Sequence, residues 1–140
     1  MTSASPLNDA ENALLLAGVS EFNNGRYWHA HEEWEDLWKR LKVDFPEPQY
    51  KALQGLIQCA ALLYQYQKEN SRGVSNMWLK LCEKMGYPEN LKFTNLWGID
   101  VSYLLAKIES HFIAANNADW NLNCNLVQIH LSEELKVDES

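Results

Sequence analysis

A chain of 140 residues with 46% hydrophobic and 22% charged residues is large and apolar enough for one packed core without disulfide or metal support. The formal net charge of −7 and the scattered placement of the 12 Lys and Arg residues disfavour nucleic acid, because binding to phosphates needs clustered positive charge. No apolar run approaches the roughly 18 residues of a membrane span, so we expect neither nucleic acid nor a membrane as a partner.

Helical periodicity begins near the N-terminus, and the alternation typical of strands is almost absent from the chain. Asn8 or Asp9 is a suitable cap for a first helix, and Asn24-Gly25 ends this helix with a residue that tolerates positive φ. A second helix is expected over about residues 26–42, since its apolar residues recur at spacings of three and four. The residues that set this spacing are Tyr27, Ala30, Trp34, Leu37 and Leu41.

The Pro-rich sequence DFPEPQ then breaks the chain, and a third helix is expected from about Pro48 to Gln67. This helix is apolar on most of its circumference, so we expect it to be the most buried. Because the break is short, the second and third helices are expected to be antiparallel neighbours. Gly55 is expected to lie where these two helices cross, since a glycine permits the close approach of a neighbouring helix.

A fourth helix is expected after Ser71, a suitable cap, and Gly86 is a suitable end for it. Asp100 is expected to cap a fifth helix whose apolar residues again recur at helical spacing. From about Asn116 the sequence is rich in Asn and then acidic, so we predict that it wraps around the helices and frays at its end.

The predicted fold is all-α, a single compact bundle of about five helices in one domain, residues 1–140. The core is expected over about residues 8–115, and a wrapping or partly disordered C-terminal tail over about residues 116–140. The three cysteines are odd in number and form no CxxC pair, which is typical of reduced thiols in the cytosol. The polar start MTSASPLND lacks the apolar core of a signal peptide. Both features predict a cytoplasmic location.

The densest group of titratable and aromatic residues lies in FNNGRYWHAHEEWEDLW, residues 22–38. On a helix, His31 and Glu35 are four residues apart, and Glu32 and Glu35 are three apart, so their side chains can converge on one patch. Trp28 and Trp38 flank this patch on the same general side of the helix. The chain therefore carries its most evident candidate site on the second helix.

The third helix supplies the expected polar partners of this patch. Gln54 and Gln58 are four residues apart on an otherwise apolar helix, and an unpaired buried amide costs roughly 1–3 kcal/mol. We therefore predict one cluster of side chains between the second and third helices. Its expected binding residues are Tyr27, His31, Glu32, Glu35, Trp38, Gln54 and Gln58.

The same segments resemble a known family. The run over residues 22–38 is followed by YKALQGLIQCAALLY, ENSRGVSNMWLKL and LWGIDV, and this order is similar to that of the bacterial and archaeal family called domain of unknown function 309. The similarity spans roughly residues 14–108. The family pattern falls on Phe22, Gly25, Tyr27, His31, Glu32, Glu35, Trp38, Gly55, Leu56, Ile57, Gln58, Gly98, Ile99 and Asp100. The resemblance implies a compact helical bundle with a shared polar pocket, and it brings no established activity.

The chain departs from the family at Trp28-His29, where relatives often carry an acidic residue, so His29 is assigned no function. Three kinds of function fit the remaining residues. A binding module would use the pocket and its Trp rim for a small molecule or a protein partner. A structural or interaction protein would use a network between His31 and Gln58 to fix the register of the helices and would present an aromatic patch.

The third kind of function is hydrolysis, which we keep as the alternative to a binding or structural and interaction module. A hydrolase would use Glu32 or Glu35 as general base and His31 as acid or metal ligand. These three residues are also the candidate ligands of a divalent metal, because helical bundles hold metals with carboxylates and imidazoles on facing helices. The zinc-protease motif H-E-x-x-H is excluded, since Glu35 stands where its second His would be.

Overall fold

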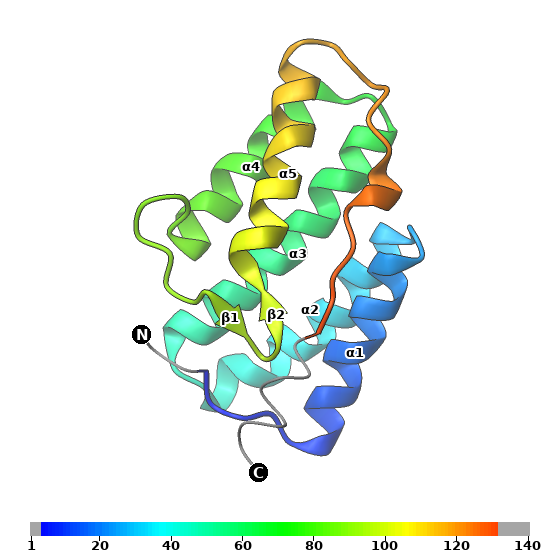
Figure 1. Cartoon of the computed structure of the whole chain (residues 1–140). Coiled ribbons are helices and arrows are strands. Elements are labelled where there is room, and N and C mark those ends of the chain that lie inside the picture. Colours follow the sequence, from blue (N-terminus) through cyan, green and yellow to red (C-terminus); the bar gives the residue numbers. More distant parts are fainter. Residues whose placement is uncertain (1–3, 132–140) are drawn as a thin grey trace.

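The computed structural model describes residues 4–131, and five α-helices form most of this part of the chain (Figure 1). The helices are α1 (Asp9–Asn23), α2 (Tyr27–Asp44), α3 (Glu47–Gln67), α4 (Ser71–Met85) and α5 (Val101–Asn116). The other described elements are the strands β1 (Asn95–Leu96) and β2 (Ile99–Asp100) and the 3₁₀ helix η1 (Cys124–Leu126). The predicted all-α class and the predicted number of helices are confirmed.

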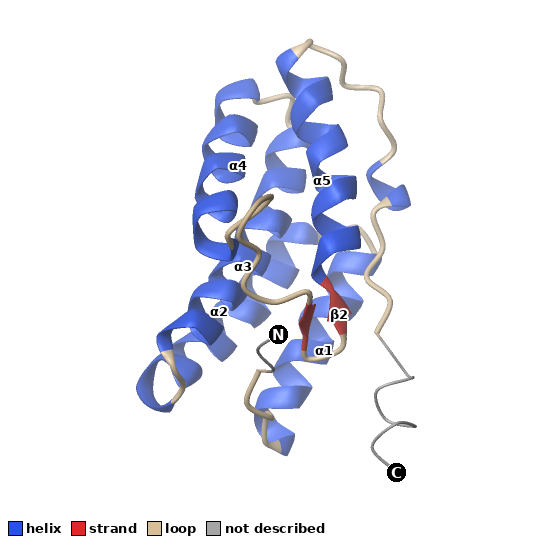
Figure 2. Ribbon diagram, turned by 60° about the vertical axis from the view of Figure 1, so that its left-hand side comes forward, coloured by secondary structure: helices blue, strands red, loops and turns tan. Residues whose placement is uncertain are grey.

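Helices that follow each other in sequence pack together, α1 on α2, α2 on α3 and α3 on α4, and α5 lies against both α3 and α4 (Figures 1 and 2). Helix α3 is central in this arrangement, and eleven of its 21 residues are buried. This confirms the expectation that the third helix is the most buried. None of the described helices is both long enough and apolar enough to cross a membrane.

Side-chain caps fix the starts of α1 and α5 where the sequence predicts them. The Asn8 side chain accepts from the backbone N–H of Glu11, and the Glu11 carboxylate accepts from the backbone N–H of Asn8. This reciprocal pair satisfies two N–H groups that the helix itself leaves without partners. At the start of α5, the Asp100 carboxylate accepts from the backbone N–H of Tyr103 at 3.1 Å.

The start of α4 differs from the prediction by one residue. Asn70, not Ser71, is the cap, and its side chain accepts from the backbone N–H of Gly73 at 3.1 Å. Both residue types are good caps, so the sequence alone did not distinguish them. The predicted end of the helix is confirmed, because Gly86 has a φ of 76° in the left-handed conformation that glycine adopts readily.

The prediction that Gly55 lies where α2 crosses α3 is wrong. The atoms nearest to the place of a Cβ on Gly55 all belong to Met85, so this glycine admits α4 and not α2. Helix α2 makes its close approach to α1 instead, where the indole of Trp34 covers Gly18. The Trp34 Nε1–H donates to the carbonyl oxygen of Leu15 at 3.1 Å, which pairs the one polar atom of this buried side chain.

Residues 117–131, which we call the strap, run back beside α5 and toward α1 (Figure 1). Two buried tyrosines hold the strap to the helices. The hydroxyl of Tyr66 donates to the carbonyl oxygen of Asp119 at 2.7 Å, and that of Tyr27 donates to the carbonyl oxygen of Cys124 at 3.2 Å. The strap is the described part of the predicted tail, and residues 132–140 of that tail lie outside the described residues.

The short hairpin of β1 and β2 was not predicted from the sequence. The two strands are antiparallel and are joined by Trp97-Gly98, both with positive φ. Ile99 also forms an antiparallel bridge with Leu131 at the end of the strap. Strands of two residues are too short to show the alternation by which a strand is recognised in sequence.

The candidate site on helices α2 and α3

Tyr27, predicted to line the site, points into the core. Its ring lies edge-on against that of Phe22 with 5.2 Å between the ring centroids, and only 2% of the residue is exposed. Burial raises the pKa of the Tyr27 hydroxyl above its ordinary value. The hydroxyl donates to the carbonyl oxygen of Cys124 in the strap. Tyr27 therefore joins α2 to the strap and is not part of the exposed surface of α2.

A row of contacts between aromatic rings crosses from α2 to α3. The His31 and Trp28 rings are stacked, with 4.8 Å between centroids and an angle of 6° between planes. The Trp28 ring also contacts that of Tyr64, at 5.3 Å between centroids, and the Lys68 Nζ lies 4.8 Å from the centroid of Tyr64. We call these four residues the aromatic ladder. Trp28 is 47% exposed, so one large face of the ladder is in contact with solvent.

Three of the predicted site residues carry a buried polar atom that has no hydrogen-bond partner within residues 4–131. These atoms are His31 Nδ1, Trp38 Nε1 and Gln58 Oε1. The large majority of buried side-chain polar atoms in native proteins have a partner, so each exception calls for an explanation. The indole N–H is a donor, the amide oxygen an acceptor, and the imidazole nitrogen can be either, depending on its tautomer.

The predicted carboxylates do not converge on His31. The Glu35 Oε2 lies 4.0 Å from the His31 Nε2, a distance too long for a hydrogen bond, and the Glu35 side chain is 47% exposed. Glu32 is exposed and Gln54 is half-buried. The structure therefore brings Glu35 near His31 and leaves Glu32 in solvent.

Gln58 belongs to a different side of α3 from the aromatic ladder. Tyr64 faces α2, while Gly55 faces α4. At about 100° per residue, Gln58 points about 60° from Gly55 and about 120° from Tyr64. Gln58 thus lies nearer to the α4 side, and no hydrogen bond within residues 4–131 joins its Oε1 to His31 Nδ1.

The described part of the chain contains no group of three or more His, Cys, Asp or Glu residues that could hold a metal ion. His31, Glu32 and Glu35 are therefore not arranged as a metal centre. The physical reason is the chemistry of the facing helix, because α3 presents the ring of Tyr64 to this part of α2. A phenol ring is no substitute for the second carboxylate and imidazole pair that bundle metal sites use.

Sequence reasoning missed two members of the aromatic ladder, Tyr64 and Lys68. The stacking of Trp28 on His31 follows from their i,i+3 spacing on one helix. A contact across two helices has no such signal, since it depends on the rotation of α3 about its axis. Packing between the helices determines which residue of α3 contacts Trp28. The sequence pattern of one helix does not contain this information.

The family model described as Domain of unknown function (DUF309) matches residues 15–77. This segment contains the His-Glu-x-x-Glu-x-x-Trp and Gly-Leu-Ile-Gln motifs, and the match confirms the family that the sequence resemblance named. The Gly-Ile-Asp motif at residues 98–100 lies outside the matched segment. No curated protein and no solved structure matches the chain.

Proposed function

We propose that this chain, whose residues 15–77 belong to the family described as Domain of unknown function (DUF309), is a binding module that uses the aromatic ladder as its binding surface. The observation that carries the proposal is the buried Nδ1 of His31, which has no partner within residues 4–131. A buried polar atom without a partner costs about 1–3 kcal/mol, and a hydrogen bond from a bound partner would remove that cost.

The exposure of Trp28 supports the same proposal. The fold buries Trp34 completely but leaves Trp28 47% exposed, stacked on the imidazole ring of His31. Trp and Tyr are enriched among the residues that contribute most of the binding energy in protein interfaces. Trp28 and Tyr64 therefore form a contact surface of the kind that such interfaces use.

The geometry favours binding over hydrolysis. A general acid or base acts within about 2.6–3.2 Å of its partner or through one water. The Glu35 Oε2 is 4.0 Å from the His31 Nε2, beyond this distance, and the Glu35 side chain is 47% exposed, so Glu35 makes no hydrogen bond that would orient the imidazole. The partner we propose has a flat apolar group that packs on Trp28 and a hydrogen-bonding group for His31 Nδ1. An aromatic side chain of a peptide and a small heteroaromatic molecule both have this chemistry.

Nuclear magnetic resonance with N-acetyl-tryptophanamide as the probe tests the proposal, because this molecule combines a flat ring with two amides. We expect saturable shifts of the Trp28 indole and His31 ring signals, and we expect Trp28→Ala to weaken binding by at least about tenfold, or 1.4 kcal/mol. Leu79→Ala is the matched control, because Leu79 is also a large exposed apolar residue but lies on α4. Equal binding by the Trp28→Ala and Leu79→Ala variants, or no saturable shift, would contradict the proposal.

A further inference from the structure

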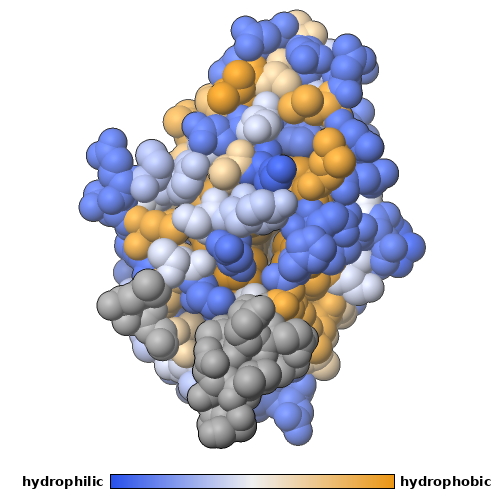
Figure 3. All heavy atoms as spheres, viewed as in Figure 1, coloured by the Kyte–Doolittle hydropathy of each residue, from blue (hydrophilic) through white to orange (hydrophobic). Residues whose placement is uncertain are grey.

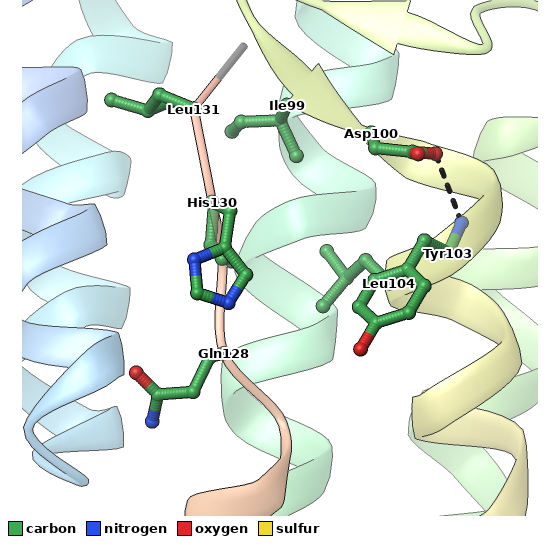
Figure 4. A pocket seen from close by; sticks show the side chains of 8 residues that line it. Ile99, Asp100, Tyr103, Leu104, Gln128, His130 and Leu131 are labelled. Atoms are coloured by element: carbon green, nitrogen blue, oxygen red, sulfur yellow. Dashed lines mark hydrogen bonds between the residues drawn. The ribbon is translucent and has the colours of Figure 1, made fainter.

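The strap is separated from α5 by cavities at two places. One cavity, of about 370 Å³, lies between the end of the strap, β2 and the first turn of α5. Figure 4 shows His130 of the strap and Tyr103 of α5 on either side of it, and Figure 3 shows hydrophobic atoms in a hollow on this face of the molecule. A second cavity, of about 340 Å³, lies between the last turns of α5 and the strap residues Asp119 and Leu122. The attachment of the strap therefore depends on individual contacts between these cavities.

The side chain of Tyr66 on α3 makes the contacts at the second cavity. Its hydroxyl donates to the carbonyl oxygen of Asp119 and accepts from the backbone N–H of Leu122 at 3.0 Å. The Trp120 ring packs on the Tyr66 ring with 5.1 Å between centroids. We call residues 120–123, which these contacts hold against α3, the latch.

The chain is fixed on both sides of the latch by contacts that do not involve Tyr66. Before the latch, the backbone N–H of Asp119 donates to the carbonyl oxygen of Ala114 at 2.8 Å. After the latch, the carbonyl oxygen of Cys124 accepts from the hydroxyl of Tyr27. The latch can therefore move away from Tyr66 as a short loop between two fixed points.

The Tyr66 ring also contacts His111 of α5, which lies edge-on against it at 4.8 Å between centroids. His111 is 3% exposed, and its Nε2 has no hydrogen-bond partner within residues 4–131. Its Nδ1 lies 3.4 Å from the carbonyl oxygen of Lys107. A protonated imidazole has two N–H donors, so the Nε2–H of a charged His111 would need water as its acceptor.

His111 is the titratable group that responds to mildly acidic pH at this place. Burial lowers its pKa, and the carbonyl oxygen of Lys107 only partly opposes this. On the side of α4, α5 presents Phe112, whose ring is stacked on that of Trp78. Of the titratable groups around His111, only histidine has an ordinary pKa between 5.5 and 7.5. The others are Tyr66 on α3, Glu69 after α3, Lys107 on α5, and Asp119 and Cys124 in the strap.

We propose that the latch opens when His111 takes up a proton, while the five helices stay folded. Opening breaks only the contacts of Tyr66 with the strap and lets water reach the imidazole, whereas unfolding of the bundle would break its whole core. The fold thus contains a pH-sensitive device that exposes Tyr66 and Trp120 in mildly acidic solution. This inference is independent of the proposed function of the aromatic ladder.

Amide hydrogen exchange, measured by nuclear magnetic resonance at pH 7.5 and pH 5.5, tests the proposal. The N–H of Leu122 reports opening of the latch, and that of Leu63, fully buried on α3, reports unfolding of the bundle. We expect Leu122 to be protected at least about tenfold less than Leu63 at both pH values. Below about pH 6.5 the open state gains up to a factor of ten for each pH unit, until the lower pKa of the closed state is reached. The protection factor of Leu122 should therefore fall by about threefold to tenfold between pH 7.5 and pH 5.5.

The variant His111→Gln removes the titrating group, so the protection factor of Leu122 should then be the same at both pH values. His29→Gln is the matched control, because His29 is exposed on α2, and it should keep the fall seen in the wild type. Four results would overturn the proposal: equal protection of Leu122 and Leu63, no measurable protection of Leu122 at pH 7.5, no fall at pH 5.5, or the same fall in His111→Gln.

Discussion

The side chain of Asn23 and the backbone of Ile129, 106 residues apart in sequence, are joined by two hydrogen bonds of opposite direction. The Asn23 amide nitrogen donates to the Ile129 carbonyl oxygen at 2.8 Å, and the Ile129 N–H donates to the Asn23 amide oxygen at 2.7 Å. The side chain of Gln128 also donates to the backbone carbonyl of Asn23 at 3.1 Å. The last turn of α1 thus fixes the end of the strap, which forms one wall of the cavity beside α5.

Asn23→Ala should lower the free energy of unfolding by about 1–3 kcal/mol, because it leaves both polar groups of the Ile129 backbone without their partner. Asn23→Asp should have an intermediate effect, since a carboxylate still accepts from the Ile129 N–H but no longer donates. Urea denaturation of the three proteins measures these differences. A change within about 0.5 kcal/mol for Asn23→Ala, the range of ordinary surface substitutions, would contradict the prediction.

Gly→Ala substitutions at the two buried helical glycines, Gly18 and Gly55, should differ in their effect on stability, because one has a rigid neighbour and the other a flexible one. A Cβ on Gly18 would overlap the indole of Trp34, which is fully buried and hydrogen-bonded, whereas a Cβ on Gly55 would meet the unbranched side chain of Met85. Overpacking lowers the stability by about 1–3 kcal/mol, and the higher helix propensity of Ala raises it by at most about 1 kcal/mol.

We therefore expect Gly18→Ala to be destabilising by about 1–2 kcal/mol in urea denaturation, as the balance of these two effects. Gly55→Ala should cost at least about 1 kcal/mol less, because a Met side chain changes rotamer more readily than a buried indole. Equal destabilisation by the two variants, or a larger effect at Gly55, would contradict this explanation.

These two glycines also show what the sequence could predict. The helices and several of their ends followed from local signals, such as the cap at Asn8 and the left-handed end at Gly86. A glycine in a helix indicates a close approach, but the approaching helix depends on rotation about the helix axis, and so Gly55 was assigned to the wrong neighbour. Spacing likewise placed His31 beside Trp28, while the contact with Tyr64 came only from packing.

His111 should make the stability of the fold depend on pH. Burial lowers the pKa of His111, and its hydrogen bond with the carbonyl of Lys107 only partly opposes this. The ring lies edge-on against Tyr66 at 4.8 Å between centroids, and its Nε2 is buried without a partner in the described part of the chain. An unfolded histidine has a pKa of about 6.5, so between that value and the lower folded pKa the unfolded chain binds more protons.

The contribution of His111 to stability is therefore complete above about pH 6.5 and is lost as the pH falls below it. His111→Gln should show a smaller decrease in the free energy of unfolding between pH 8 and pH 5.5 than the wild type. His29→Gln is the control, because His29 is exposed on α2. If His111→Gln shows the same decrease as the wild type, burial of this imidazole does not control the pH dependence.

The two roles considered for His31 predict opposite changes in stability. His31→Phe keeps a flat ring to stack on Trp28 and removes the buried nitrogen that has no partner within residues 4–131. If His31 belongs to a binding surface, the variant should be as stable as the wild type or more stable by up to about 1–3 kcal/mol, and it should bind N-acetyl-tryptophanamide more weakly. If the imidazole belongs to a structural network, the variant should be less stable.

Gln58→Met is the control for His31→Phe, because it also removes a buried polar atom that lacks a partner in the described residues, but from the side of α3 away from Tyr64. Its side chain has nearly the same shape, so we expect equal or higher stability and no change in the affinity for N-acetyl-tryptophanamide. Denaturation in urea at pH 8 and titration of the probe measure both quantities for both variants. A loss of more than about 1 kcal/mol in His31→Phe would show that the imidazole stabilises the bundle, since the Phe ring keeps the stacking on Trp28 and lacks only the ring nitrogens.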